Sequence, residues 1–300
     1  MSLLSAISYK ENMKDKKIPL SEYVLRFLFP LQCVCCSTPL PINSPMELCS
    51  DCKDELPLMQ KFVHTNPGGA SIGKVYCAFG YEKGIRKAIH NLKFNDKTGN
   101  ATALIELSYP HLERFFAFNK DPLMPLPTGG IDANDRFSTT DKKALPQLEH
   151  ESIQSLKVYD IILYIPMHPR RKRKRGYNQS ELLARHLARK MDIPVIKKAM
   201  VKVVNTRAQS ALGKAGRFRN LLGAFLVKDS TLIKGKNILL VDDVMTTGNT
   251  LEQCGKALKD AGATCVDAFV VAMRRKVSFN ERLINNSTFP PKRASSVLRS

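Results

Sequence analysis

The chain has 300 residues, which is enough for one sizeable α/β domain with a small module beside it. Hydrophobic residues make up 43% and charged residues 25%, a composition typical of a globular fold. No run approaches the roughly 18–20 apolar residues of a transmembrane helix, and residues 1–17 carry four lysines where a secretory signal would be apolar. We therefore predict a cytoplasmic protein without a membrane span.

The net charge of +20 is distributed unevenly along the chain. Residues 1–150 hold 18 basic and 16 acidic side chains, whereas residues 151–300 hold 29 and 11. Such asymmetry favours an anionic partner, for example a polyphosphate, a nucleic acid or a membrane surface. A solvated basic face is the alternative. A candidate phosphate-binding loop, residues 241–250, lies in the basic half of the chain and favours the anionic ligand.

Four cysteines near the N-terminus form two CxxC pairs with twelve residues between them: Cys33, Cys36, Cys49 and Cys52. Two such pairs can close a tetrahedral zinc site, with Zn–S distances of about 2.3 Å and no open position for catalysis. Unrelated buried thiols are the alternative. We expect a structural zinc module at residues 18–60, whose small core needs the metal in order to fold. The other cysteines are expected to be packing residues: Cys35, Cys77, Cys254 and Cys265.

Strands and helices alternate in the rest of the chain. Strands are predicted at residues 74–81, 159–166, 195–204, 224–227, 236–241 and 265–273. Helices are predicted at residues 82–92, 101–116, 180–191 and 249–261. The third helix has the predicted apolar stripe Leu182, Leu183, His186 and Leu187. This alternation predicts an α/β fold with a doubly wound parallel sheet.

The predicted domain spans residues 74–276 and has segments of different composition within it and around it. Residues 119–157 are rich in Pro, Gly, Ser and Asp and are predicted to be a flexible insertion. Residues 1–17 form an N-terminal extension, and residues 277–300 are predicted to be a basic disordered tail.

A candidate phosphate-binding loop lies between the strand at 236–241 and the helix at 249–261. Its residues 241–250 read VDDVMTTGNT. Ligands bind at the carboxyl ends of strands in open α/β sheets, and the start of a helix exposes N–H groups to a phosphate. Asp242 and Asp243 are well placed to accept hydrogen bonds from vicinal sugar hydroxyls. The sequence therefore predicts a ribose 5-phosphate ligand, and a plain strand–turn–helix connection is the alternative.

The same ten residues resemble the phosphoribosyl-pyrophosphate (PRPP) signature of type I phosphoribosyltransferases. The resemblance implies a parallel sheet with helices on both faces and a flexible hood. It also implies that Asp242 and Asp243 bind the ribose hydroxyls, with magnesium on the pyrophosphate and ribose oxygens. The 5′-phosphate would be held by six consecutive residues: Met245, Thr246, Thr247, Gly248, Asn249 and Thr250. Some purine-salvage members carry an acid at the position of Thr246, so no general base is expected there.

Further blocks resemble the ComF family, in which a four-cysteine zinc module precedes a phosphoribosyltransferase domain. They are IPMHPR at residues 165–170, RGYNQSELLA at 175–184, Thr206-x2-Gln209-x2-Leu212, Arg217-x2-Asn220, Gly223-Ala224-Phe225 and Leu92-Lys93-Phe94. The resemblance covers roughly residues 20–118 and 158–275. It implies a role in natural competence, beside a helicase that acts on incoming single-stranded DNA.

A run of six basic residues, 170–175, follows the strand at 159–166. In related transferases the loop after this strand contacts pyrophosphate. The expected pyrophosphate-side residues are therefore Met167, His168, Arg170, Arg171 and Arg175. A solvated run or a nucleic-acid patch is the alternative. Lys93 and His168 are the catalytic candidates: Lys93 would reach the pyrophosphate and His168 would donate to the leaving group, with a structural histidine as the alternative.

Three functions remain open on the sequence. The first is a transferase in which a nucleophile displaces pyrophosphate from C1 of PRPP. The second is an accessory protein that binds single-stranded DNA through the basic half of the chain. The third is a module that binds PRPP without turnover. We predict a ComF-type protein that binds PRPP and supports DNA uptake.

Overall fold

The computed structural model describes residues 25–44, 46–118, 158–204 and 223–274. The predicted N-terminal extension at 1–17, the insertion at 119–157 and the tail at 277–300 lie outside the described residues. The domain boundaries therefore stay a prediction. Within the described part of the chain, each helix is too short or too polar to cross a membrane.

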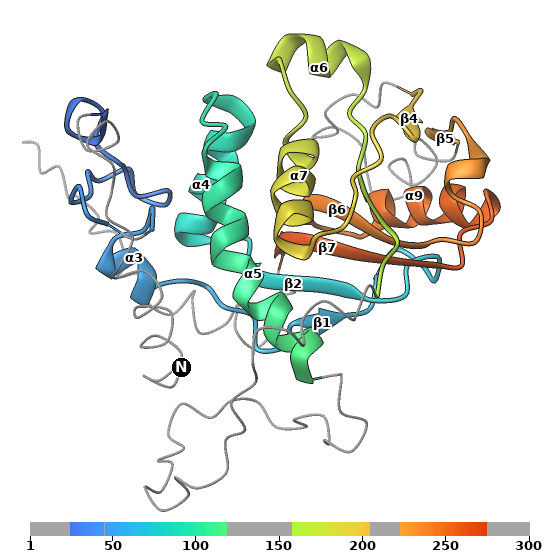
Figure 1. The fold of residues 1–300 in the computed structure, drawn as a ribbon, viewed down its shortest axis with the longest axis horizontal. Coiled ribbons are helices and arrows are strands. Elements are labelled where there is room, and N and C mark those ends of the chain that lie inside the picture. The colour runs from blue at the N-terminus through green and yellow to red at the C-terminus, as the bar shows by residue number, and fades with distance from the viewer. Residues whose placement is uncertain (1–24, 45, 119–157, 205–222, 275–300) are drawn as a thin grey trace, which may run out of the picture.

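A five-stranded sheet forms the centre of the molecule (Figure 1), in the order β1-β2-β7-β6-β3. The strands are β1 (Val63–His64), β2 (Val75–Gly80), β3 (Ile161–Tyr164), β6 (Asn237–Met245) and β7 (Cys265–Met273). All neighbours are parallel except β1 and β2. Four of the six predicted strands are confirmed in this sheet. One boundary was wrong, because β6 does not end at residue 241 but continues beside β7 to Met245, so that Asp242 and Asp243 belong to the strand.

The chain winds in opposite directions from β3 and from β6. Helix α7 (Gln179–Met191) follows β3 and leads to Val195, which forms a parallel bridge with Ile162 on the outer edge of β3. Helix α9 (Asn249–Asp260) leads from β6 to β7, on the other side. The sheet is thus doubly wound, as predicted. Its switch point lies between the carboxyl ends of β3 and β6, where such sheets bind ligands.

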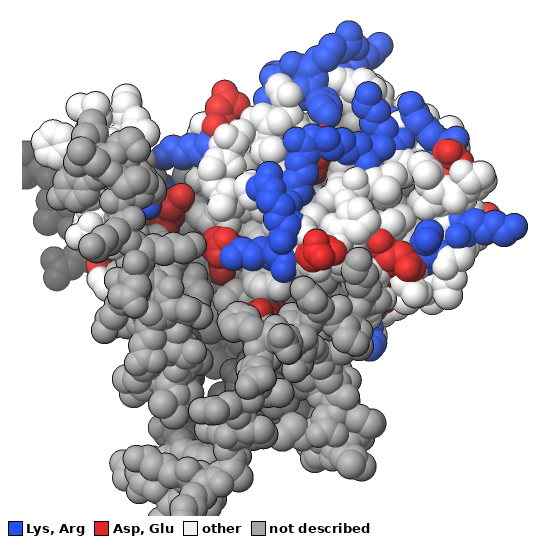
Figure 2. All heavy atoms as spheres, in the orientation of Figure 1, with Lys and Arg blue, Asp and Glu red and all other residues white. Residues whose placement is uncertain are grey.

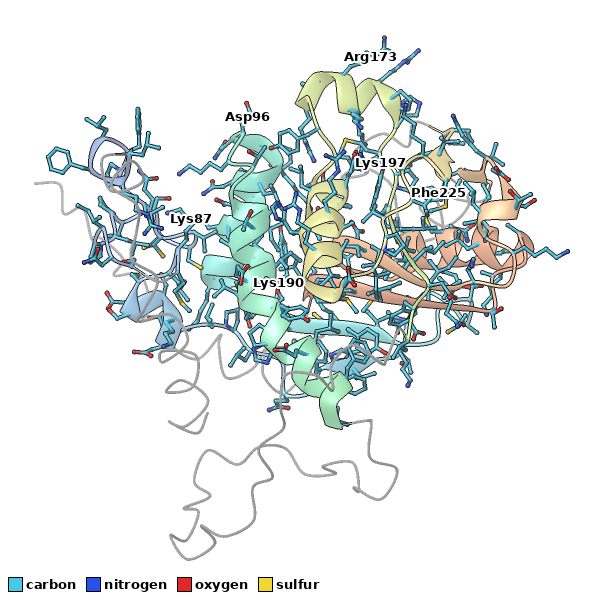
Figure 3. The ribbon with its side chains drawn as sticks, in the orientation of Figure 1. Lys87, Asp96, Arg173, Lys190, Lys197 and Phe225 are labelled. Carbon is cyan, nitrogen blue, oxygen red and sulfur yellow. The ribbon has the colours of Figure 1, made fainter. Side chains whose placement is uncertain are left out.

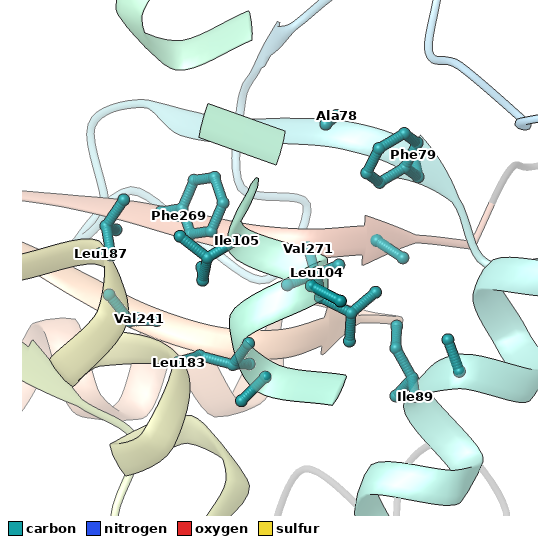
Figure 4. Close-up of a cluster of buried hydrophobic side chains, with 14 of the residues drawn as sticks. Ala78, Phe79, Ile89, Leu104, Ile105, Leu183, Leu187, Val241, Phe269 and Val271 are labelled. Atoms are coloured by element: carbon teal, nitrogen blue, oxygen red, sulfur yellow. The ribbon is translucent and has the colours of Figure 1, made fainter. Parts of the chain in front are cut away.

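The two faces of the sheet carry separate hydrophobic clusters. One face is covered by α4 (Lys83–Phe94), α5 (Asn100–Phe118) and α7, and Figure 4 shows part of this cluster. The other face is covered by α9. The buried side of α4 is the predicted one: Ile85, Ala88, Ile89 and Leu92. On α7 the stripe is rotated from the prediction, because Leu183, Ala184 and Leu187 are buried whereas Leu182 and His186 are partly exposed.

The predicted strands at 195–204 and 224–227 do not join the central sheet. Only β4 (Met200–Lys202) and β5 (Phe225–Val227) are strands, and they pair with each other in antiparallel fashion. Lys198 has a φ of 60°, a left-handed conformation that interrupts an extended chain. The long strand predicted at 195–204 is therefore wrong. A short 3-10 turn, η2 (Ser230–Leu232), follows β5.

The basic run after β3 is a helix, α6 (Pro169–Arg175), and the expected loop is wrong. Pro169 stands at its first position, where a missing N–H costs nothing. His168 caps its start and Gly176, with a φ of 84°, ends it. Figure 1 shows α6 above α7, at the top of the view.

The four-cysteine module packs against α4 at the edge of the domain (Figure 1). Its second CxxC pair is carried by a short helix, α3 (Ser50–Asp54), with Cys49 at the N-cap. Val34, Leu40 and Leu48 join the same hydrophobic cluster as α4 and α5. The module is thus continuous with the main core.

Candidate functional site

The two acidic residues near the end of β6 have different environments. Asp243 is buried, with 3% of its surface exposed, and its Oδ1 accepts a hydrogen bond from Lys93 Nζ at 2.7 Å. Asp242 Oδ1 accepts from the Ser180 hydroxyl at 2.8 Å and from the Asp243 backbone N–H at 2.9 Å. Helices α4 and α7 therefore each supply a donor to the acidic pair.

Asp243 forms a charged pair with Lys93. Burial alone would lower the Lys93 pKa, but the charge and hydrogen bond of Asp243, together with the charge of Asp242, outweigh burial and raise the lysine pKa. The second carboxylate oxygen, Oδ2 of Asp243, is buried and has no hydrogen-bond partner among the described residues. A buried charged oxygen without a partner is costly, and such atoms occur where a ligand, an ion or water supplies the missing bond.

The Asp242 carboxyl holds its proton unusually well. Burial and then the neighbouring charge of Asp243 raise its pKa from 3.8 to about 7, against the opposing effects of Lys93 and Ser180. A cation that bound here would favour the ionised form and lower this pKa again.

The turn after β6 is fixed by contacts with the segment 66–71. Gly248 has a φ of 76°, and a Cβ at this position would lie 1.9 Å from Asn66 Oδ1, so no other residue fits. Glu252, in the first turn of α9, accepts hydrogen bonds from the Ser71 hydroxyl at 2.7 Å and from Asn66 Nδ2 at 3.2 Å. The exposed Thr246 and Thr247 hydroxyls stand at this turn, beside the amino end of α9.

A pocket of about 370 Å³ opens at the carboxyl ends of β3 and β6. Asp242, Asp243 and Thr250 line one part of it. Four cationic side chains also line it, and they come from α4, α6 and β4: Lys93, Arg171, Arg175 and Lys202. A pocket with a paired carboxylate and several cations suits a ligand that has both hydroxyl groups and phosphates.

Most of the predicted site residues meet at this pocket. Met167, His168, Arg171 and Arg175 line it together with Lys93. Arg170 is exposed on α6 and lies outside the lining. Of the six residues expected to hold the 5′-phosphate, only Thr250 belongs to the lining, and the neighbouring turn contains Met245, Thr246, Thr247, Gly248 and Asn249.

His168 has a structural task. Its Nδ1 accepts a hydrogen bond from the Arg170 backbone N–H at 3.2 Å and so caps α6. Slight desolvation and then the charge of Arg170 lower the pKa of the ring, which favours the neutral form. Since Nδ1 makes the capping bond, Nε2 is the nitrogen that can donate to a ligand. The role of His168 as a donor to the leaving group stays a prediction.

Arg175 is held on two sides. Its Nη1 donates to Gln179 Oε1 at 2.6 Å, and its guanidinium lies 5.0 Å from the centre of the Phe94 ring. Phe94 is 62% exposed although it is a large apolar residue, and it also lines the pocket. These contacts fix the direction of the guanidinium.

Sequence reasoning missed Lys202, Ser180 and Phe94 as pocket residues. Lys202 is partly buried, and its pKa is lowered by burial and then by the charge of Arg171. It comes from a strand far away in the sequence, so no local pattern identifies it. Phe94 and Ser180 stand inside the family-like blocks at 92–94 and 175–184, which was the available signal.

The four predicted metal-ligand cysteines come together. The sulfur atoms of Cys33, Cys36, Cys49 and Cys52 all lie within 4.8 Å of one another. Cys36 Sγ and Cys49 Sγ are 3.7 Å apart, close to the edge of about 3.8 Å that four sulfurs make around zinc at 2.3 Å. The cluster could therefore hold a metal ion. Cys35, Cys77 and Cys254 are buried packing residues as expected, whereas Cys265 is partly exposed.

Comparisons with known proteins agree with this arrangement. The family described as "Phosphoribosyl transferase domain" matches residues 178–283. Competence protein F of Haemophilus influenzae is 35% identical over 118 residues, or 39% of this chain and 52% of the relative. DNA utilization protein YhgH of Escherichia coli K12 is 33% identical over 114 residues, or 38% and 49%. YhgH of Salmonella typhi is 25% identical over 236 residues, or 79% and 82%.

The chain thus spans about half the length of the first two relatives. A solved glutamine PRPP amidotransferase from B. subtilis is 21% identical, with a TM-score of 0.28, over 40% of this chain and 24% of that one. The named relatives, the matched domain and the four-cysteine cluster ahead of it agree with the resemblance to the ComF family.

Proposed function

We propose that the pocket binds PRPP together with magnesium. The observation that carries this proposal is the buried Oδ2 of Asp243, which has no partner among the described residues and stands beside Asp242. Vicinal ribose hydroxyls would donate to this acidic pair. The cations across the same pocket suit the pyrophosphate of the ligand.

Each part of PRPP then has a matching surface. Asp242 and Asp243 accept from the ribose hydroxyls, and residues 245–250 hold the 5′-phosphate at the amino end of α9. Lys93, Arg171 and Arg175 contact the pyrophosphate, with Met167 and His168 beside it. Magnesium would neutralise part of the pyrophosphate charge, and its own charge would favour the ionised form of Asp242, whose pKa is otherwise raised.

Turnover is a separate step of the proposal. A transferase would need a nucleophile that attacks C1 while the bond to pyrophosphate breaks, so that the leaving group keeps the electron pair. Arg175 and Lys93 would neutralise the departing charge. Release of pyrophosphate from PRPP in the presence of an acceptor distinguishes a transferase from a module that binds PRPP without turnover.

We further propose that the cysteine cluster holds structural zinc and that the protein supports DNA uptake in the cytoplasm. The names of the relatives, a competence protein and a DNA utilization protein, support the second part. A competence helicase or another DNA-processing protein would be the partner.

A second candidate function, binding of single-stranded DNA, is favoured by the basic surface of α6 and α7. Figure 2 shows lysine and arginine side chains gathered over α6 and continuing down the same face. Figure 3 places Arg173 at the outer side of α6 and Lys190 at the far end of α7. A continuous cationic surface beside an exposed aromatic residue, Phe94, suits a nucleic-acid backbone and its bases.

Calorimetry with magnesium and PRPP tests the first proposal. We expect binding by the wild type and by the control Asp260→Asn, which changes an exposed carboxylate at the far end of α9. The double variant Asp242→Asn/Asp243→Asn should not bind. Ribose 5-phosphate and pyrophosphate, tested alone, should each bind more weakly than PRPP. Absence of binding by the folded, metal-loaded wild type contradicts the proposal.

The DNA candidate has its own test, which leaves the pocket intact. Arg173 and Lys174 are exposed on α6 and lie outside the pocket lining. Reversing both charges should weaken the binding of a single-stranded oligonucleotide and reduce the salt dependence of that binding. The control Lys256→Glu lies on α9, on the opposite face of the sheet, and should change neither. Equal binding by all three proteins contradicts this candidate.

A further inference from the structure

Helix α4 connects the four-cysteine module with the pocket. Gly84 lies in its first turn, and Lys93 and Phe94 end it. The distance along the helix from Gly84 to Lys93 is about 14 Å at 1.5 Å per residue. One end of α4 therefore contacts the module, while the other forms a wall of the pocket.

The contact at the first end is unusually close. A Cβ on Gly84 would lie 2.5 Å from Cys35 Cβ and 2.8 Å from its Sγ, distances that real side chains do not tolerate. Lys87, one turn later, donates to the backbone carbonyl of Cys36 at 3.2 Å, and Figure 3 shows it on the side of α4 that faces the module. The absence of a side chain at Gly84 is thus what lets the module lie against α4.

Helix α4 is held between two neighbours. Within the domain α4 packs against α5. On the other side, Cys33, Val34 and Cys35 of the module belong to the same hydrophobic cluster as α4. Packed interiors transmit small displacements because they leave few voids to absorb them. A shift of the module would therefore tilt α4 and move its far end.

The far end has little tolerance for movement. Lys93 Nζ reaches Asp243 Oδ1 at 2.7 Å, and Phe94 carries the Arg175 guanidinium on its ring. A displacement of about 1 Å at a binding group can cost a large factor in function. Both the acidic pair and one phosphate-side cation thus depend on the position of α4.

We infer that Gly84 and Cys35 are positioning residues, whose contact lets the four-cysteine module set the place of Lys93 and Phe94 in the pocket. The effect on PRPP affinity rests on the proposed function, whereas the position of Lys93 does not. Neither residue is one of the four cysteines that could hold a metal. The metal-bearing module then acts as part of the ligand site, beyond folding its own segment.

The variant Gly84→Ala tests this inference in the full-length, metal-loaded protein. Alanine favours a helix more than glycine does, so any loss comes from the contact and not from α4 itself. We expect Mg-PRPP affinity to fall about tenfold, with metal content unchanged. Lys93 should react faster with an amine-acylating reagent, as read by mass spectrometry. The matched control is Gly99→Ala, because a Cβ there meets nothing within 4 Å.

A rescue separates positioning from general damage. In Gly84→Ala/Cys35→Gly the two clashing atoms are gone, and the nearest remaining atom of residue 35 is its Cα at 3.5 Å, an ordinary contact. This double variant should regain the affinity and Lys93 reactivity of Cys35→Gly alone. Failure of this rescue overturns the inference.

The variant Gly84→Leu places a larger side chain against Cys35 and covers the case in which the module adjusts to alanine. If neither Gly84→Ala nor Gly84→Leu changes Lys93 reactivity, the module does not position Lys93 and the inference is wrong. If the wild type binds no PRPP, the proposed function fails, but the Lys93 reactivity of these variants still decides the coupling.

Discussion

The four-cysteine module and the pocket both gather chemically matched side chains, but they do so over different lengths of chain. The cysteines come from residues 33–52, within one short segment. The charged groups of the pocket come from α4, α6, β4 and β6, so the sheet must form before they meet. A site formed by one local segment can be predicted from the spacing of its residues. A site assembled from distant segments can be predicted only where one of those segments carries a recognisable motif.

The two regions also differ in what stabilises them. Between residues 33 and 52 the buried aliphatic side chains that the structure describes are Val34, Leu40 and Leu48, so four sulfurs around one metal would supply much of the module's stability. The pocket has charges of both signs held by packed helices. In its acidic pair, Asp243 Oδ1 contacts Lys93, whereas Asp243 Oδ2 has no hydrogen-bond partner among the described residues. Loss of metal should therefore affect the module first, whereas loss of one charge should affect ligand binding more than folding.

The largest expected effect is on the module. Cys36→Ser removes one of the four sulfurs that could hold a metal ion, and zinc contributes on the order of 10 kcal/mol to the folding of small zinc-finger peptides. We expect loss of bound metal and fast amide exchange over residues 33–52, while the central sheet stays protected. Cys265→Ser changes a partly exposed thiol outside the cluster and is the control. Equal exchange in both variants would mean that the module folds without metal.

The next effect concerns the charged pair of the pocket. Asp243→Asn removes the charge that faces Lys93, and we expect PRPP affinity to fall about 100-fold because charged hydrogen bonds are lost. Lys93→Met leaves a buried carboxylate without its cation and should lower the free energy of unfolding by about 2–3 kcal/mol.

Denaturant unfolding and calorimetry measure the two quantities. Arg86→Met, at an exposed position on the same helix, is the control and should change neither. A Lys93→Met protein as stable as the wild type would show that the pair is not a source of stability.

The sequence predicted the parts whose cause is local. The CxxC spacing, the helix of α4 and the strand of β7 each follow from nearby residues, and all were confirmed. The extent of β6 could not be predicted, because it is set by pairing with β7 and not by its own two acids. Lys202 could not be assigned either, since only the antiparallel pairing of β4 with β5 brings it to the pocket.

The conformation of the basic run at residues 170–175 also could not be predicted from its own charges. The resemblance to related transferases suggested a loop after β3, but Pro169 and the His168 cap start a helix, and Lys172 then pairs with the buried Glu181 at 3.0 Å.

A smaller effect concerns the pH dependence of stability. The folded-state pKa of Asp242 is raised to about 7, so the folded protein keeps a proton that the unfolded chain releases above about pH 4. The wild type therefore loses stability as pH rises between these values, and it does not regain this contribution above pH 7. Asp242→Asn removes the loss.

We expect Asp242→Asn to raise the thermal midpoint by a few degrees more at pH 8 than at pH 5, although it weakens ligand binding. Thermal unfolding at the two pH values measures this difference. The same stabilisation at both would show that the carboxyl is ionised throughout, and the opposite sign would show that its pKa is lowered by folding.

The smallest effect concerns the support of the turn that follows β6. Glu252 accepts from the Ser71 N–H and hydroxyl and from Asn66, and its carboxylate lies in the first turn of α9, where negative charge is favourable. Glu252→Gln keeps the shape and an acceptor oxygen but removes the charge. We expect a loss of about 1 kcal/mol in the free energy of unfolding and a change in PRPP affinity smaller than about threefold. The affinity change is small because the lost negative charge no longer competes with the phosphate, which partly offsets the looser turn. Denaturant unfolding and calorimetry measure the two changes. A loss of PRPP affinity as large as that of Asp243→Asn would contradict the expectation and make Glu252 part of the ligand site itself.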